Sequence, residues 1–381
     1  MKNYKQLESE LNSICLNRTD EVRALILAHL SRTHIVMLGN PGTAKSYLVR
    51  KFSEAFPTTE QSTTSIPFFE VALNNFTKPE DVFGPIDVQK WKSESEIVYK
   101  SENFLPNARI AFIDELSRGE SVLNSLLTIV NERTFNVNGI AKKVPLETAV
   151  SATNFKLNAV EMEAMRDRFL QWLNPKRLTN EDDLINLWMA DDKSVSVRIS
   201  EDEVRKCREE VEAVKLNPDV LKSFKMVLDS LNKEMGIVLS DRRTKMMIKL
   251  IKASSWYNGH SEIQVEDLKD IWSCCWTDEA DIVKIKAIIN KIVDYESYVI
   301  DDCNASAMNI FEVWSTSGKG VDSSLKARND IIDVQDRLKA LKNIKQRNQY
   351  SYMQACAIVE TFRSEISKHY GIIKDTPKKL Y

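Results

Sequence analysis

The sequence predicts an α/β domain with a parallel sheet between helices, followed by a region of helices alone. Two apolar runs carry the first prediction: residues 35–38 lead into a Gly- and Pro-rich loop, and residues 108–113 end on two carboxylates. Near-continuous apolar runs are typical of strands buried on both faces of a parallel sheet. From Thr179 onward, charged amphipathic periodicity without strand patterns predicts helices only.

The helices and strands of the α/β region are predicted from the spacing of apolar residues, from helix-capping residues and from turn residues. Helical spacing, alternating or continuous apolar runs, and Gly/Pro punctuation distinguish them. In chain order we expect helices within 1–34, a strand at 35–38, a helix at 47–56, a strand at 66–73, a short helix closed by Gly84-Pro85, a polar insertion at 87–105, a strand at 108–113, a helix at 121–130, a hairpin at 131–139 turning on Asn138-Gly139, and a strand at 146–154.

Composition excludes several classes of protein. The chain has 381 residues, of which 43% are hydrophobic and 28% charged, as expected of a globular protein with two or three domains. No apolar run is long enough for a membrane span, and the start lacks the apolar core of a secretion signal. The six cysteines show no CxxC spacing, so we expect reduced thiols in a cytoplasmic protein rather than zinc or disulfides.

The loop after the first strand is the strongest functional signal. Its residues are Gly39, Asn40, Pro41, Gly42, Thr43, Ala44, Lys45 and Ser46, and Tyr47 opens the following helix. Strand, loop and helix in this order are the context of a phosphate-binding loop, whose backbone N–H groups form an anion cradle with the helix dipole. We expect Lys45 to reach the β- and γ-phosphates of a nucleotide and Ser46 to bind Mg²⁺.

Ala44 departs from the usual pattern, which has glycine before the lysine. We expect the loop to tolerate alanine if its φ angle stays negative. An ordinary Gly/Pro turn before a helix is the alternative to phosphate binding. The apolar run before the loop and the helix after it favour the phosphate-binding interpretation.

Asp114 and Glu115 end the second apolar run. Ligands of open α/β sheets bind at the carboxyl ends of the strands, so we expect these carboxylates beside the phosphate loop. Asp114 suits Mg²⁺ through a bound water, and Glu115 suits a general base that polarises the attacking water. The alternative is that the two acidic residues only cap the next helix.

Polar residues farther along the chain are further candidates. Asn154 ends a predicted strand and is expected to hydrogen-bond the γ-phosphate or the attacking water; a simple turn-starting asparagine is the alternative. Arg166 and Arg168 are candidates for an arginine finger, which a neighbouring subunit often supplies, and spacing does not rank them. Arg242 and Arg243 follow a predicted helix cap, where the dipole disfavours cations, so a functional reason is expected.

These residues together resemble the AAA+ ATPases of the MoxR family, most closely its RavA branch. Residues 39–46 resemble a Walker A motif with the alanine that this branch has, and residues 110–115 resemble a Walker B motif. Asn154 resembles sensor 1, Arg168 the arginine finger and Arg242 sensor 2. The resemblance is highly specific because the whole set occurs in order.

The resemblance covers about residues 20–300 and implies an organisation in three parts. These are a P-loop AAA+ core at 1–178, an all-helical lid at 179–300 and a helical C-terminal extension at 301–381. The family implies a hexameric ring with an insertion at about 84–105 and a hairpin at about 134–144 facing the pore. It also implies chaperone-like remodelling of a protein partner, often one with a von Willebrand factor A domain.

The resemblance also assigns roles within a site between subunits. Lys45, Ser46 and Asp114 would bind ATP and Mg²⁺. The catalytic roles fall on four residues: Glu115 to activate water, Asn154 to orient it, Arg168 of a neighbour to stabilise the transferring charge, and Arg242 to report nucleotide state to the lid. Arg166 and then Arg133 are the alternatives to Arg168, and Arg243 is the alternative to Arg242.

Three classes of function fit such a site. An ATP-driven protein remodeller is the leading interpretation. A nucleic-acid motor or loader is the second, and the net charge of −2 and the absence of a basic, aromatic tract argue against it. A scaffold that binds ATP without turnover is the third, and Glu115 argues against it because a scaffold needs no general base. In the tail, two amphipathic stripes predict a helical hairpin within the chain; a partner-binding helix is the alternative.

Overall fold

A computed structural model of the chain describes residues 1–57, 66–154, 165–191, 193–317, 321–341, 344 and 348–369. The chain divides into two compact units, residues 1–285 and 286–381. The end of the predicted extension, residues 370–381, lies outside the described residues. No helix in the described part of the chain is long and apolar enough to cross a membrane.

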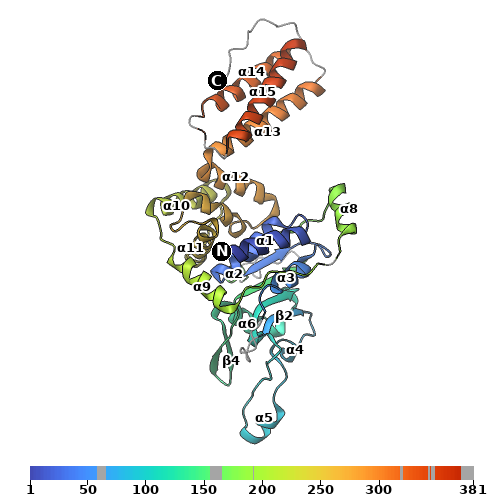
Figure 1. Ribbon diagram of the computed structural model, residues 1–381, viewed down its shortest axis with the longest axis vertical. Helices are drawn as coiled ribbons and strands as arrows, with labels where there is room; N and C mark the ends of the chain where they lie inside the picture. The colour runs from blue at the N-terminus through green and yellow to red at the C-terminus, as the bar shows by residue number, and fades with distance from the viewer. Residues whose placement is uncertain are drawn as a thin grey trace. The chain divides into compact units, whose positions relative to one another are not determined.

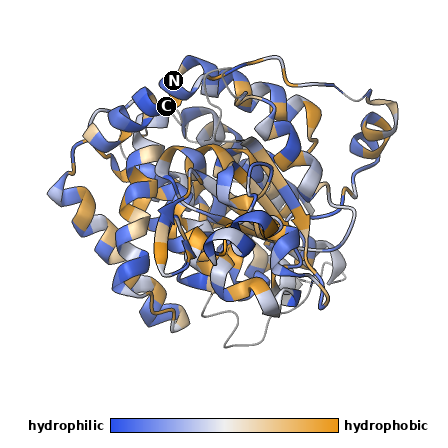
Figure 2. Cartoon of the chain, turned by 90° about the horizontal axis from the view of Figure 1, so that it is seen from below, coloured by the Kyte–Doolittle hydropathy of each residue, from blue (hydrophilic) through white to orange (hydrophobic). Residues whose placement is uncertain are grey.

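The first unit is built on a five-stranded parallel sheet (Figure 1). In spatial order its strands are β2 (Ile66–Ala72), β3 (Ala108–Asp114), β6 (Thr148–Thr153), β1 (Ile35–Leu38) and β7 (Gln171–Leu173). All side chains of β6 and β7 are buried, and hydrophobic residues concentrate on the central strands in Figure 2. The predicted α/β class is confirmed, and the carboxyl ends of all five strands meet at one edge.

Helices surround this sheet, with α2 packed against β1 and β7 and α3 against β2 and β3. Those of the α/β part are α1 (Lys2–Ile14), α2 (Thr19–Ser31), α3 (Lys45–Ser53), α4 (Pro79–Phe83), α5 (Val88–Glu94) and α6 (Glu120–Glu132). Those that follow are α8 (Glu181–Met189), α9 (Glu201–Ala213), α10 (Pro218–Met235), α11 (Asp241–Asn258), the 3₁₀ segments η3 (Val265–Cys274) and η4 (Glu279–Asp281), and α12 (Ile282–Val293). The region after the sheet is helical, as predicted.

The predicted hairpin and insertion form one packed projection. The hairpin strands are β4 (Thr134–Val137) and β5 (Ile140–Lys143). Asn138 and Gly139 both have positive φ, 52° and 75°, which matches the two-residue turn that Asn-Gly favours. Phe135 of the hairpin lies between Phe83 at the end of α4 and Tyr99 of the insertion, with ring centroids 4.9 and 5.5 Å away. The insertion carries α5 at its tip (Figure 1).

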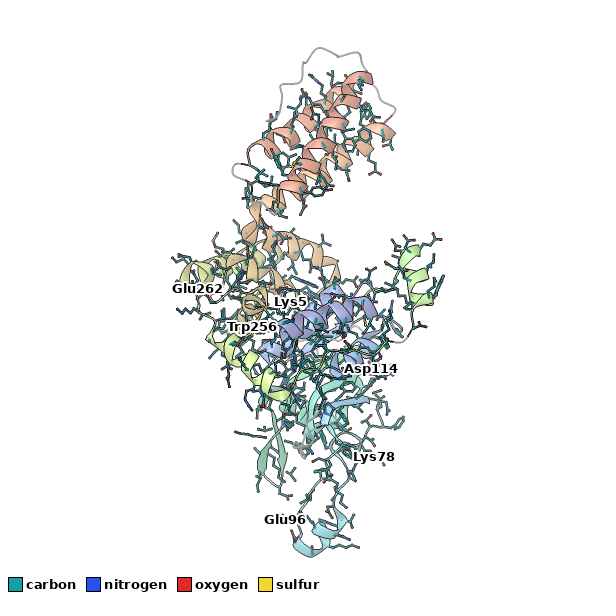
Figure 3. All side chains as sticks on the ribbon, in the orientation of Figure 1. Lys5, Lys78, Glu96, Asp114, Trp256 and Glu262 are labelled. Atoms are coloured by element: carbon teal, nitrogen blue, oxygen red, sulfur yellow. The ribbon has the colours of Figure 1, made fainter. Side chains whose placement is uncertain are left out.

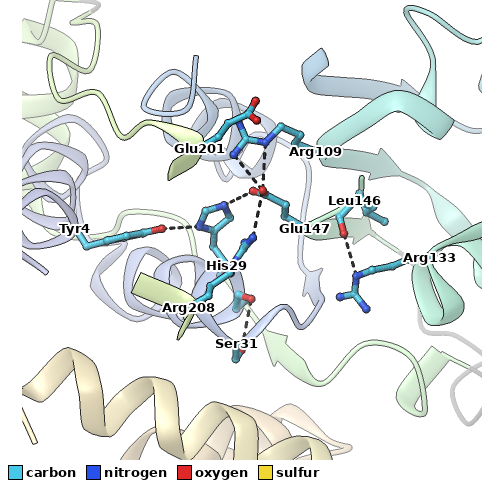
Figure 4. A network of polar contacts seen from close by, with 10 residues as sticks. Tyr4, His29, Ser31, Arg109, Arg133, Leu146, Glu147, Glu201 and Arg208 are labelled. Atoms are coloured by element: carbon cyan, nitrogen blue, oxygen red, sulfur yellow. Dashed lines mark hydrogen bonds and ion pairs between the residues drawn. The ribbon is translucent and has the colours of Figure 1, made fainter. Parts of the chain in front are cut away.

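A buried polar network ties a helix of the later region to the sheet (Figure 4). Glu147, just before β6, lies 2.6 Å from His29 Nε2, 3.0 Å from Arg109 Nη2 and 3.2 Å from Arg208 Nη1 on α9. His29 Nδ1 lies 3.1 Å from the Tyr4 hydroxyl, so a neutral imidazole can donate from Nε2 and accept at Nδ1. Burial lowers the pKa of His29 to about 4, which keeps the ring neutral at pH 7.

The second unit is a bundle of three helices, α13 (Tyr295–Thr316), α14 (Val321–Lys339) and α15 (Gln349–His369). Both predicted apolar stripes point into one core: Ile331 and Leu338 of α14 are buried with Val359 and Ile366 of α15. The predicted hairpin of helices within the chain is therefore confirmed, with α13 as a third member. α13 runs unbroken through residue 300, where the extension was expected to begin.

Candidate functional site

The loop between β1 and α3 has the backbone of an anion cradle. Gly39 donates to Thr153 O at the end of β6, 3.2 Å away, which fixes the loop at the carboxyl edge of the sheet. Gly42 and Ala44 both have left-handed φ angles, 77° and 62°. The expectation of a negative φ at Ala44 is wrong, because this residue is the N-cap of α3 and its left-handed turn starts the helix at Lys45. Alternating turn conformations of this kind direct successive N–H groups inward.

Lys45 connects the loop to the neighbouring strand. Its Nζ donates to Gly39 O at 2.8 Å, to Asn40 O at 2.9 Å and to Asn154 Oδ1 at 3.1 Å. Burial lowers the pKa of Lys45, while the negative charges of Asp114 and Glu115 act in the opposite direction. The amine is therefore a partly desolvated donor group at the centre of the loop, whose backbone carbonyls and Asn154 now bind it.

Asn154 in turn contacts the predicted general base. Its Nδ2 donates to Glu115 Oε1 at 2.8 Å. Residues 114 and 152 pair across β3 and β6, so the ends of these strands bring the two side chains together. Asp114 accepts a hydrogen bond from the Glu115 amide at 3.0 Å. Lys45, Asn154 and Glu115 thus form a continuous polar chain.

The second carboxylate oxygen of Glu115 has a different environment. Oε2 is buried and accepts no hydrogen bond from any described residue, and Arg118 Nε lies 3.8 Å from it. A buried polar atom without a donor costs about 1–3 kcal/mol, so such atoms in native proteins call for a specific explanation. A water molecule in front of Glu115 could donate to this oxygen, which fits the predicted activation of water by Glu115.

A pocket of about 480 Å³ opens beside the loop, within the size range of small-molecule sites. Four segments form its wall: the phosphate loop with the end of β1, the end of β6, the turn after β7 and the turn before α12. The lining residues are Leu38, Gly39, Asn40, Thr43, Thr153, Asn154, Asn174, Pro175, Lys176, Arg177, Trp276, Thr277, Asp278 and Glu279. Pro41 and Gly42 are exposed at the loop tip, and Ser46 and Tyr47 lie in the first turn of α3.

Asp114 lies in the main body of the first unit. Glu96 lies at the tip of the insertion, far from Asp114 (Figure 3). The insertion therefore does not contribute to the pocket wall. The nucleotide pocket and the projection that carries the insertion are therefore two separate regions of the first unit.

Arg18 belongs to this site and carries no motif signal. Its side chain is buried, with Nε donating to Thr43 O at 3.3 Å and Nη2 to Lys176 O at 2.6 Å. It therefore fixes the phosphate loop to the turn after β7. Only the three-dimensional fold joins these segments, so sequence analysis missed Arg18.

Arg168 lies away from this pocket in its own chain. It comes just before β7, whose first residue Gln171 pairs with Ile35, the first residue of β1. Arg168 is therefore at the amino-terminal edge of the sheet, whereas Lys45 follows the carboxyl end of β1. Within a single chain, Arg168 and Lys45 are therefore not brought together.

Arg242 lies on the same side as Arg168. It is exposed and contacts the Asn131 side chain near the end of α6, which runs from the carboxyl edge of the sheet towards the amino edge. The cap of its helix, Ser240, lies 3.3 Å from Asp167, next to Arg168. The candidate arginines from two distant stretches thus gather on one face.

The alternative arginines bind backbone carbonyls. Arg243 is buried and donates to the carbonyls of Cys274, Phe169 and Leu170 at 2.9, 3.3 and 2.6 Å, and to that of Arg166. These hydrogen bonds to backbone carbonyls explain why a cationic residue occupies the first turn of α11. Arg133 likewise donates to Leu146 O at 2.9 Å and to Arg32 O at 2.5 Å, and Arg166 donates to Trp276 O at 2.7 Å.

Comparison with solved structures agrees with the fold. The chain is similar to a putative ATPase from Cytophaga hutchinsonii, with a TM-score of 0.59 and 18% identity over 77% of this chain and 93% of that chain. At this level of identity the likeness concerns the fold alone.

Comparison of sequences identifies the family. The model of the MoxR domain in the MoxR-vWA-beta-propeller ternary systems matches residues 2–212, and an AAA lid domain model matches residues 219–289. The uncharacterized protein MJ0079 of Methanocaldococcus jannaschii is 32% identical over 306 residues, 79% of this chain and 77% of that protein. The chaperone MoxR1 of Mycobacterium tuberculosis is 26% identical over 175 residues, 43% of this chain and 42% of MoxR1. With its phosphate loop, strand-end carboxylates and helical lid, the chain belongs to the MoxR family of AAA+ ATPases.

Proposed function

We propose that this chain is an ATP-hydrolysing ring motor that remodels a protein partner. The observation that carries the proposal is the polar chain from Lys45 through Asn154 to Glu115, with Glu115 Oε2 buried and lacking a donor among the described residues. In this arrangement Lys45 binds the phosphates, Asn154 orients the attacking water and Glu115 accepts its proton.

The residues fit ATP and Mg²⁺ as cofactors. Lys45 supplies a cation at the loop, and Ser46 with Asp114, through water, supplies the oxygen ligands that Mg²⁺ prefers. When bound, the metal neutralises charge on the phosphates. The left-handed turns at Gly42 and Ala44 support phosphate binding, because they present backbone N–H groups to an anion.

The position of the candidate arginines supports assembly of several copies. Arg168 and Arg242 lie on the face opposite the pocket of their own chain, so a neighbouring copy is needed to bring them to it. Such a head-to-tail contact closes into a ring when its rotation permits. The hexameric state and the RavA branch remain predictions from the family resemblance.

A protein is the preferred partner. The slightly acidic net charge of −2 disfavours nucleic acid. The projection instead exposes Val88, Trp91 and Ile97 of the insertion and Ile140 of the hairpin, the kind of apolar surface that binds polypeptide. The matching family model describes systems with a vWA component, which supports a partner with a von Willebrand factor A domain.

Steady-state ATP hydrolysis with matched binding assays tests the proposal. Lys45→Ala should abolish ATP binding, because the phosphate charge loses its cation. Glu115→Gln should keep ATP binding and lose about 10²–10⁴-fold in turnover. Glu209→Gln, at an exposed position of α9, is the matched control and should behave as wild type.

The outcomes separate the three classes of function. Stimulation of turnover by DNA would favour the nucleic-acid motor, and ATP binding without any turnover would favour the scaffold. Wild-type nucleotide affinity in Lys45→Ala would contradict the site itself. Capture of a vWA-domain protein by the ATP-bound Glu115→Gln protein, and not by Lys45→Ala, would identify the partner class.

A further inference from the structure

Helix α8 presents an apolar surface that the described residues of its own chain leave uncovered. None of its residues is buried, and Trp188 and Met189 in its last turn are 74% and 79% exposed. Asn180 caps the helix by accepting from the amides of Asp182 and Asp183. A helix of nine residues is marginal in water without packing, so this one needs a surface to pack on.

α8 is anchored next to the phosphate loop. Its Asp183 contacts the side chain of Asn17 in the turn between α1 and α2. The next residue of that turn, Arg18, binds both Thr43 of the loop and Lys176 of the pocket wall. α8 therefore belongs to the pocket side of the first unit, the side where a neighbouring copy would have to supply an arginine.

A complementary hollow lies between α10 and α11. Its volume is about 140 Å³, and five apolar side chains, Leu228, Leu231, Ile237, Val238 and Leu239, line it together with the polar Asp229, Asn232 and Thr244. An apolar cavity of about 150 Å³ can hold a group as large as benzene. Val238 at its rim is 78% exposed. The hollow ends directly before Ser240 and Arg242, so it belongs to the arginine side.

The surface of α8 and the α10–α11 hollow are complementary in position and in charge. α8 and the pair α10 and α11 lie on opposite sides of the first unit in Figure 1, as a head-to-tail contact requires. The first turn of α8 carries exposed Glu181 and Asp182, whereas α11 exposes Arg242, Lys245 and Lys249 at helical spacing beside the hollow. Opposite charges of this kind orient an association and set its register.

We propose that the last turn of α8 in one copy of this chain docks into the α10–α11 hollow of the next copy. The docking rests on the proposed function, since it pairs the pocket side of one copy with the arginine side of its neighbour. It would hold Arg168 of that neighbour towards the nucleotide pocket and would cover the exposed indole of Trp188. α8 is thus assigned as an assembly element of the ring.

Cross-linking between two single-cysteine-addition variants tests the contact. Met189→Cys and Val238→Cys proteins are mixed with ATP and treated with a short bismaleimide reagent. Of the native cysteines, five are buried and Cys356 is half-buried, so wild-type protein treated in parallel gives the background. The mixture should yield covalent dimers, and one chain with both changes should yield a ladder of multimers. Replacing Val238→Cys by Ile140→Cys, on the hairpin and 64% exposed, should give background only.

Assembly measurements provide a second readout. Trp188→Ala should raise the protein concentration at half assembly about tenfold or more, because a large apolar side chain loses its burial. Its nucleotide affinity in dilute protein should stay within twofold of wild type. Met353→Ala, which removes a side chain 69% exposed on α15, is the matched control and should not change assembly.

The failures can be told apart. Lack of nucleotide binding by the wild-type protein would contradict the proposed function. Normal nucleotide binding with background cross-linking and unchanged assembly of Trp188→Ala would overturn the docking alone. A wild-type protein that remains monomeric with ATP would also overturn it. Equal cross-linking of Met189→Cys to Val238→Cys and to Ile140→Cys would indicate non-specific contact and contradict the assigned surface.

Discussion

Asn154 donates its amide N–H to Glu115 Oε1 at 2.8 Å while its amide oxygen accepts from Lys45 at 3.1 Å. One side chain thus joins Lys45, proposed to bind phosphate, to Glu115, the proposed general base. Because the amide has both a donor and an acceptor, no isosteric residue reproduces both contacts. A carboxylate here would bind Lys45 but repel Glu115.

Asn154→Ala should lower turnover by about 10²-fold, the size of effect found when one positioned hydrogen-bond donor is removed from a catalytic site. Nucleotide affinity should change much less, because Lys45 keeps its place in the loop. Asn124→Ala on the exposed face of α6 is the control. Turnover within twofold of wild type would mean that Asn154 only starts a turn, as the alternative interpretation has it.

The two left-handed residues of the phosphate loop predict opposite effects of exchanging alanine and glycine. Gly42→Ala should destabilise the first unit by about 1 kcal/mol, because a Cβ at φ 77° is strained although no atom lies within 4 Å of it. Ala44→Gly removes that strain at φ 62° and should be neutral or stabilising by up to about 1 kcal/mol, with ATP binding kept. Urea unfolding measures both. Destabilisation by Ala44→Gly beyond that of Gly42→Ala would contradict the left-handed cap.

The buried network around His29 predicts loss of stability in mild acid. In the unfolded chain His29 takes up a proton near its usual pKa of 6.5, whereas burial in the folded protein lowers that pKa to about 4. The unfolded state therefore binds more protons between these values, and the free energy of unfolding falls as pH decreases from about 6.5 to 4. Hydrogen bonding from His29 and the positive charges of Arg208 and Arg109 overcome the effect of burial and lower the pKa of Glu147, so the loss continues in stronger acid.

His29→Gln should reduce this pH dependence. The variant lacks the titrating ring, so the difference in unfolding free energy between pH 7.5 and 4.5 should shrink by about 2 kcal/mol. Urea unfolding at the two pH values measures it. An unchanged difference in the variant would show that other groups cause the acid loss.

Much of the site could be predicted because its signals are local. The residues around Lys45 and the end of β3 carry their strand, loop and carboxylate context within a few positions, and Asn138-Gly139 specifies its own turn. The left-handed φ of Ala44 could not be predicted, since negative φ is the default for alanine. Arg18 was missed, and Arg243 was expected to have a functional rather than a structural role, because each binds carbonyls that only the folded chain brings near.

Arg168 at the amino-terminal edge of the sheet predicts catalysis between subunits. Arg168→Ala should assemble and bind ATP yet lose about 10³-fold or more in turnover, because a finger stabilises charge that develops in a neighbour's site. Arg133 and Arg243 are tied to backbone carbonyls, so their replacement should lower stability before it lowers turnover in folded protein. Arg166→Ala is the comparison variant. Normal turnover in Arg168→Ala would place the finger elsewhere, with Arg166 the next candidate and Arg133 after it.

Mixing Arg168→Ala with Lys45→Ala tests the trans role directly. Neither variant alone has a complete site. In a mixed ring, an intact Lys45 meets an intact Arg168 wherever an Arg168→Ala pocket faces a Lys45→Ala neighbour, so part of the wild-type turnover should return. Native mass spectrometry checks that the subunits exchange. If exchanged rings stay inactive, titration of wild type with Lys45→Ala decides between two causes: a loss steeper than linear means that the ring requires every site, and a linear loss means that Arg168 acts within its own chain.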